Sequence, residues 1–210
     1  MRVDLVAATA LRTPATEEVT PGEAAIAFAS LSDVPPAVWL RRRFDSLVGA
    51  RSELLEHASA TLRIQDVSRD AAAAIRRHGL AVSERAGTGA VTPTAISADE
   101  ELTRLFEAAV EESAFVRGEL LQALEEAMAD EPNVLVRRKR AREAANALIP
   151  AAAATELVAT GSYRAWREFI VAHNGRFEHE EIRELAHAVL EIMRGEAPLL
   201  FGDLAEGERR

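Results

Sequence analysis

The sequence predicts a mixed α/β protein in which short strands alternate with longer helices. Two observations support this class: three short segments are typical of strands, one of them with clear apolar alternation, and the stretches between them carry helix caps and helical apolar spacing. A chain of 210 residues is also long enough to bury one sizeable core. We therefore expect a single domain spanning residues 1–210, and neither a purely helical nor a purely β fold.

The N-terminal part is expected to contain one strand followed by two helices. Residues 2–9 form an apolar run typical of a strand. Thr20 supplies a helix cap, Pro21 suits the first helical turn and Glu23 is an early acid, which together predict a short helix to about residue 30. A second helix is predicted from Pro35 to about Gly49, because its bulky apolar residues gather near one face.

The next part is predicted to contain a strand, a helix and a loop. Residues 60–67 alternate as a half-buried strand does, and Ser68 then caps a helix that ends near Gly79. Residues 80–97 are rich in glycine and other small residues and contain Pro93, so we expect them to form a loop.

The C-terminal half is predicted to contain four helices and one strand. The acidic segment 97–130 repeats apolar residues at helical spacing, which indicates a long helix that serves in packing. A further helix begins at Pro132 and ends before Pro150. The remaining predicted elements are a strand at 155–160, helices at 162–173 and 179–194, and a tail after Pro198.

Composition excludes several kinds of chemistry. Without cysteine the chain has no disulfide, no thiolate metal site and no cysteine nucleophile. A net charge of −9 argues against a general nucleic-acid binder, and no apolar window is long enough to span a membrane. The first residues lack a basic leader, so we expect a cytoplasmic protein. Small anionic ligands remain compatible with the clustered basic residues.

The C-terminal quarter carries a family resemblance. It reads ELVATGSYRAWREFI from Glu156, HEEIRELA from His179 and FGDL from Phe201. These segments resemble flavin-dependent thymidylate synthases, which methylate dUMP reductively with FAD, NADPH and methylenetetrahydrofolate. The resemblance implies an α/β subunit with long helices and a twisted, mainly antiparallel sheet. It also implies a homotetramer with active sites between subunits.

The same resemblance implies a set of FAD contacts. The family signature RHRxxSxNExSxRY falls on residues 76–89, where Arg76 and Glu84 match and Arg77-His78 inverts the expected order. Residues 50–57 keep only the Glu-His end of the pattern GHxSxxEH, and residues 161–169 follow GNYRAWRHF with two changes. The FAD-binding residues implied in this way are Glu56, Arg76, Arg77, His78, Glu84, Ser162, Arg164 and Glu168.

The positions implied to contact dUMP depart from the family. Thr88, Asn146 and His173 each stand where the family has an arginine. Arginine offers a rigid, permanently charged fork, and losing one buried charge-assisted contact costs roughly 2–5 kcal/mol. We therefore expect dUMP not to be the substrate.

Replacement contacts and catalytic groups can be named from the same comparison. Arg51 and Arg85 are the candidate substitute contacts for an anion, alongside Asn146 and His173 in the substrate site. His173 and Glu84 are the candidate catalytic groups, because both titrate.

Each candidate also has a purely structural interpretation. The basic residues 76–78 end a helix, where they interact favourably with its dipole, and residues 137–140 are typical of a solvated face. His57 beside Glu56 also suits a local hydrogen bond. His179 and Glu180 are adjacent and so lie on different helix faces, and we expect no metal site there.

Three functions follow from these observations. The favoured one is a diverged FAD enzyme acting on another substrate, such as a modified pyrimidine nucleoside or a small metabolite. The second is a non-catalytic paralog that assembles with itself or with an active relative. The third is an orthodox synthase making dTMP, which the missing arginines disfavour most.

Overall fold

The computed structural model describes residues 1–12, 18–49 and 53–204. Its four strands are β1 (Arg2–Ala8), β2 (Ser59–Ser68), β3 (Ala81–Ala90) and β4 (Ala153–Ser162). Its helices are α1 (Pro21–Ala29), α2 (Pro36–Gly49), η1 (Glu53–His57), α3 (Arg69–Arg76), α4 (Thr94–Ser97), α5 (Glu100–Ala127), α6 (Val134–Ala145), η2 (Asn146–Leu148), α7 (Tyr163–His173), α8 (Glu180–Glu196) and α9 (Pro198–Phe201). The predicted mixed α/β class is confirmed.

The strands form one sheet in the order β1-β2-β4-β3. β1 runs antiparallel to β2, with Arg2 opposite Gln65. β2 and β4 are antiparallel as well, because later residues of β2 meet earlier residues of β4. The hydroxyls of Thr61 and Thr160 lie 2.9 Å apart, and Arg63 donates to Glu156. On the other side of β4, Arg85 also bonds to Glu156. The antiparallel sheet implied by the family resemblance is thus confirmed.

The loop predicted at 80–97 is wrong, because most of this segment is strand β3 followed by the short helix α4. β3 is the edge strand and is exposed along most of its length, so no apolar alternation marks it in the sequence. Its small residues have a structural reason. A Cβ on Gly87 would come within 3.0 Å of the backbone of Ala154, and Gly89 has a φ of +76°.

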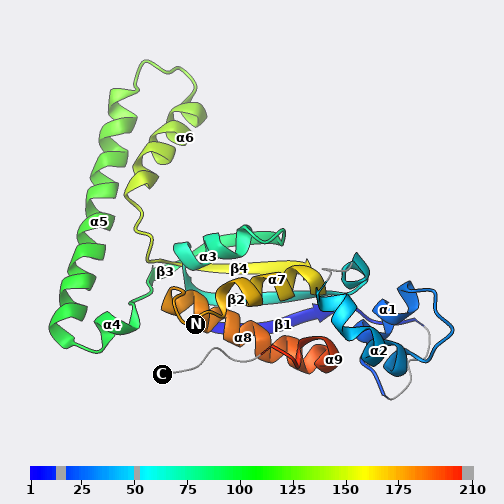
Figure 1. Cartoon of the computed structure of the whole chain (residues 1–210). Helices are drawn as coiled ribbons and strands as arrows, with labels where there is room; N and C mark the ends of the chain where they lie inside the picture. The colour runs from blue at the N-terminus through cyan, green and yellow to red at the C-terminus, as the bar shows by residue number, and fades with distance from the viewer. Residues whose placement is uncertain (13–17, 50–52, 205–210) are drawn as a thin grey trace. The chain divides into compact units, whose positions relative to one another are not determined.

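Two compact units make up the chain, and the first holds the main core. It comprises residues 1–67, 71–85 and 155–210, of which the structure describes the parts given above. β2 buries every second side chain from Ala60 to Ile64, as its alternation predicts, and α7 and α8 lie along the sheet (Figure 1). The first helix opens as predicted, with a reciprocal capping box between Thr20 and Glu23.

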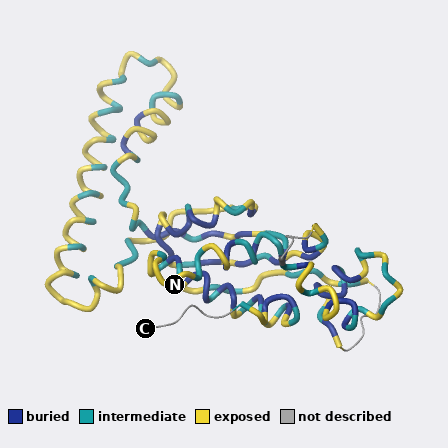
Figure 2. The backbone as a smooth tube through the Cα atoms, in the orientation of Figure 1, coloured by how far each residue is buried: buried dark blue, intermediate teal, exposed yellow. Residues whose placement is uncertain are grey.

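The second unit comprises residues 68–70 and 86–154 and is mainly helical. The long helix α5 forms as predicted from its spacing, with Asp99 as its N-cap. Its expected packing role is only partly met, because none of its residues is buried within a single chain (Figure 2). Leu105 is 59% exposed and Phe115 is 65% exposed. Among the described residues, no helix is long and apolar enough to cross a membrane.

Candidate functional site

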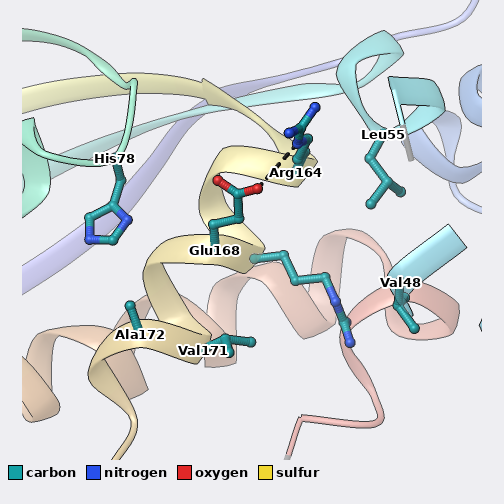
Figure 3. Close-up of a pocket in the computed structure, with 8 residues that line it drawn as sticks. Val48, Leu55, His78, Arg164, Glu168, Val171 and Ala172 are labelled. Carbon is teal, nitrogen blue, oxygen red and sulfur yellow. Dashed lines mark hydrogen bonds and ion pairs between the residues drawn. The ribbon is translucent and has the colours of Figure 1, made fainter. Parts of the chain in front are cut away.

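A cavity of about 410 Å³ opens in the first unit, between α7 and the segments that face it (Figure 3). Its volume lies in the range of roughly 300–1,000 Å³ that small-molecule sites occupy. One end of its lining comes from α2 and η1, and the other from His78, which follows α3. The lining residues are Val48, Leu55, His78, Arg164, Arg167, Glu168, Val171 and Ala172.

Helix α7 supplies most of the cavity wall, because one of its faces packs into the core and another faces the cavity. Ser162 caps the helix by accepting a 3.1 Å hydrogen bond from the Ala165 N–H. Its core face is fully buried and consists of Tyr163, Trp166, Phe169 and Ile170. Arg164, Glu168 and Val171 follow one another at four- and three-residue steps on another face, which turns them to the cavity.

Both arginines of the cavity are already paired with carboxylates. Arg164 lies 3.2 Å from Glu168 and 3.6 Å from Glu56, as nitrogen-to-oxygen distances. Arg167 donates to both carboxylate oxygens of Asp203. The lining thus holds cations whose charge is locally balanced, and it suits a largely neutral ligand with hydrogen-bonding groups better than a phosphate.

At one end of the cavity, two imidazoles meet. The Nε2 atoms of His78 and His173 lie 2.9 Å apart, and His173 Nδ1 lies 2.8 Å from Oε2 of Glu178. The rings of both histidines pack on Phe169, at centroid distances of 5.5 Å and 5.1 Å. Glu178, His173 and His78 therefore form one hydrogen-bonded chain that ends at the cavity. The packing on Phe169 fixes the orientation of both imidazole rings.

The electrostatics of this chain favour a neutral His78. Burial lowers the pKa of His78 below its ordinary 6.5, and His173 and Arg77 lower it further while Glu168 opposes them. The hydrogen bond from His173 lowers the pKa of Glu178, with a second contribution from the backbone N–H of His179. At neutral pH Glu178 is therefore ionised and holds a proton on His173 Nδ1.

Part of the residue set expected from the sequence gathers at this cavity. His78, Arg164 and Glu168 line it, and Glu56 reaches it through its ion pair with Arg164. His173 stands behind His78 and is only 13% exposed. Ser162 contributes as the cap of α7, described above.

Other expected site residues lie elsewhere, and their roles stay predictions. Arg76 at the end of α3 pairs with Glu84 on β3, and Arg85 pairs with Glu156. Asn146 belongs to the second unit, where it ends α6. Arg51 lies outside the described residues.

Sequence reasoning missed the apolar half of the lining and the part played by Glu178. The spacing of Val171 from Arg164 and Glu168 on one helix face was a usable signal for the former. No local pattern in the sequence assigns a role to Glu178. It comes near His173 because the chain turns after α7 at Asn174 and Gly175, and no motif in the sequence announces that contact.

Comparisons of the sequence with a family model and with known proteins point to the same family. The family model described as thymidylate synthase complementing protein matches residues 39–199. A flavin-dependent thymidylate synthase of Corynebacterium aurimucosum is 43% identical over 160 residues, which cover 71% of this chain and 64% of that protein. The Corynebacterium glutamicum protein of that name is 41% identical over 169 residues, covering 74% and 68%. That of Mycobacterium marinum is 35% identical over 226 residues, covering 97% and 89%. The match to the first of these relatives thus spans less than two thirds of its length.

Proposed function

The chain belongs to the thymidylate synthase complementing protein family, and from this premise we propose that it is a FAD-binding enzyme acting on a ligand other than dUMP. The substrate is a pyrimidine nucleoside or nucleotide, or another small metabolite. The relatives are named flavin-dependent thymidylate synthases, so methyl or methylene transfer and flavin redox chemistry are the candidate reactions. NADPH and methylenetetrahydrofolate are the corresponding candidate co-substrates.

The cavity residues fit the ring system of a flavin. An isoalloxazine is flat and largely apolar, with hydrogen-bonding groups along one edge. The cavity offers apolar side chains from Val48, Leu55 and Val171 and hydrogen-bonding groups from Arg164 and Glu168. When bound, the flavin would supply hydride or electron transfer, and the protein would supply binding, orientation and electrostatics.

The residues of this chain have distinct parts in that proposal. Arg164 and Glu168 orient the polar edge of the ligand, while Val48 and Leu55 exclude water from its apolar part. Arg77 is exposed beside His78 and has no ion pair within the described ranges, so it is the candidate contact for the phosphates of FAD. His78 holds or releases a proton at its ring.

One observation carries the proposal that dUMP is not the substrate. The position at which the family is expected to present an arginine is His173, whose two ring nitrogens are engaged by His78 and Glu178. It therefore cannot offer a free, permanently charged fork to a pyrimidine carbonyl. Asn146 and Thr88 remove two further charges at positions expected to contact the nucleotide.

Self-assembly is part of the proposal. A helix in water rarely leaves several large apolar residues uncovered, and a homotetramer would cover the exposed apolar side of α5. The residues that form this side are Leu102, Leu105, Phe115, Val116 and Leu120.

A non-catalytic subunit is the second candidate function. The balanced charges of Arg164 and Arg167, together with the pairing of Arg76 with Glu84, favour it, because fewer cations remain for a dinucleotide. Such a subunit would assemble with itself or with an active relative and would bind no FAD.

A visible absorption spectrum of the purified protein, with and without added FAD, tests the first candidate against the second. We expect bound flavin in the wild type and at least tenfold weaker binding in Arg164→Ala, since a contact to a charged group contributes about 1.5–3 kcal/mol. Arg138→Ala, an exposed arginine of the second unit, is the matched control and should bind FAD as the wild type does. A protein that retains no flavin after unbound FAD is removed would support the non-catalytic subunit.

The substrate claim has its own assay. The protein is incubated with FAD, NADPH, methylenetetrahydrofolate and dUMP labelled with tritium at C5. We expect neither tritium release nor dTMP. Formation of dTMP would return the chain to the orthodox activity and overturn the claim.

A further inference from the structure

The contacts of His78, His173 and Glu178 define where each proton in the chain resides. Ionised Glu178 accepts a hydrogen bond from the Nδ1–H of His173, with 2.8 Å between Nδ1 and Oε2. His173 Nε2 is then the acceptor in the neutral pair, so His78 Nε2, 2.9 Å away, carries the shared hydrogen. His78 Nδ1 is left as a lone-pair nitrogen, and the described residues provide no hydrogen-bond partner for it.

We propose that Glu178, His173 and His78 form a proton relay that ends at the cavity, where His78 Nδ1 exchanges a proton with the bound ligand. This inference rests on the proposed function, since it requires a ligand in that cavity. His78 is the residue that touches the ligand. His173 and Glu178 are positioning residues that store and stabilise the proton behind it.

The transfer balances in atoms and charge. A weak acid in the cavity gives its proton to His78 Nδ1 and keeps the bonding electron pair. His78 releases its Nε2 hydrogen to His173 Nε2, which becomes an imidazolium beside the carboxylate of Glu178. The ligand gains one negative charge and His173 gains one positive charge. The reverse sequence returns a proton to the ligand.

This arrangement selects a class of ligand. The two cavity arginines are already paired with Glu56, Glu168 and Asp203. The positive charge available to a ligand is therefore the one that forms when the imidazole pair takes up a proton. A permanent anion such as a phosphate gains nothing from a relay that must first be protonated. A neutral weak acid with an N–H or O–H group, such as an imide or an enol, gains a base and a stabilised counter-charge.

Charged groups from every neighbouring element bear on the relay. Arg77 adjoins His78 at the end of α3, and Glu168 faces it from α7; the first favours the neutral ring and the second favours the charged one. His179 follows Glu178 and donates its backbone N–H to that carboxylate at 2.9 Å. From α8, the buried His187 is hydrogen-bonded at 2.6 Å to Asn174, the residue after His173.

The first test follows the imidazole nitrogens by NMR in protein with ¹⁵N-labelled histidine, as a function of pH. The chain has five histidines, so single variants assign them. In the wild type we expect His78 to titrate in two steps, because its ring is coupled to a second imidazole across the 2.9 Å contact. In His173→Gln, His78 should titrate in one step at higher pH, because the neighbouring positive charge is gone. In Glu178→Gln, His78 should protonate only at lower pH, because the carboxylate behind the imidazole pair no longer stabilises a positive charge there.

The matched control is His179→Gln, which changes an exposed histidine next to Glu178 and keeps the backbone N–H. It should leave the two titration steps of His78 unchanged. All variants are first compared with the wild type by circular dichroism, so that a misfolded variant is recognised. A His78 titration that is the same in the wild type and in His173→Gln overturns the relay.

The second test counts protons when FAD, used as the probe ligand, binds. Calorimetry in buffers of different ionisation enthalpy gives the protons exchanged per FAD. A ligand that touches His78 Nδ1 must shift its protonation, so binding should exchange a fraction of a proton between about pH 5 and 8. We expect that exchange to vanish in His78→Gln, to move along the pH axis in His173→Gln, and to persist in His179→Gln.

The outcomes of this test separate the two proposals. If the wild type binds no FAD, the proposed function fails, and the relay proposal fails with it. If FAD binds without proton exchange at any of these pH values, only the relay proposal is overturned. Exchange that persists unchanged in His78→Gln also overturns it, because another group is then responsible.

Discussion

The indole Nε1 of Trp166 donates a 3.0 Å hydrogen bond to the carbonyl oxygen of Ala60, which ties α7 to strand β2. Trp166 is completely buried, so this bond fixes the helix that forms the cavity wall against the sheet. It is one of the contacts through which the orientation of the cavity wall depends on the core.

Replacing this indole should destabilise the protein. Trp166→Phe removes this buried hydrogen bond, which costs about 1–3 kcal/mol, and adds the cost of a smaller side chain. Urea unfolding followed by far-UV circular dichroism measures the change. Trp39→Phe is the control, since the described residues include no hydrogen bond from that indole, and it should cost less. Equal losses in the two variants would argue against a role for the bond.

Two glycines should respond to substitution in opposite directions. Gly87→Val adds a Cβ that would lie 3.0 Å from the backbone of Ala154, and further side-chain atoms beyond it. We therefore expect a lower melting temperature. Gly118 lies in the middle of α5 with open space around it, and Gly118→Ala should stabilise the helix by about 1 kcal/mol. Thermal unfolding of both variants provides the comparison. A destabilised Gly118→Ala would mean that another subunit packs closely there.

The exposed apolar side of α5 should control assembly. Leu105→Glu introduces a charge at a position that is 59% exposed in a single chain, so the monomer should fold normally while association weakens. Sedimentation velocity over a range of concentrations reports the distribution of species. Gln122→Glu adds the same charge at another exposed position of α5 and serves as the control. If both variants sediment as the wild type does, this side of α5 is no interface.

Stability should fall as the pH is lowered through the range in which His78 titrates. The pKa of His78 is lowered in the fold, so between that value and the ordinary 6.5 the unfolded chain binds more protons than the folded one. The contribution of this residue is therefore complete above pH 6.5 and declines below it. Chemical unfolding at a series of pH values should show a weaker decline in His78→Gln. An unchanged decline would assign the effect to other groups.

A separate acid-sensitive group should act at lower pH. Hydrogen bonds from Arg63 and Arg85 lower the pKa of Glu156, so this carboxylate contributes stability above its ordinary 4.5 that is lost as the pH falls further. We predict that Glu156→Gln unfolds with a weaker pH dependence below that value, while Glu143→Gln, which removes an exposed carboxylate from α6, behaves as the wild type does. Acid titration followed by fluorescence compares the three proteins.

Local sequence signals predicted most of the helices and three of the four strands. The capping box at Thr20 and the apolar alternation from Ala60 to Ile64 are dictated by nearest neighbours, so they can be read without knowing the fold. Strand β3 was missed because an exposed edge strand has no buried face, and because its glycines serve close backbone contacts that only the sheet creates.

The cavity was predictable in the same uneven way. Arg164 and Glu168 share a helix face, and the family resemblance pointed to both. The meeting of His78 with His173 joins residues 95 positions apart, and that of His173 with Glu178 depends on how the chain turns after α7. These contacts arise only when the chain folds, so residue spacing in the sequence does not predict them.

The two faces of α7 also make the protein a practical starting point for directed evolution. Substitutions at Arg164, Glu168 and Val171 alter the chemistry of the cavity without touching Trp166 or Phe169, which anchor the helix. A combinatorial library restricted to those three positions would therefore sample new ligand preferences while most members still fold.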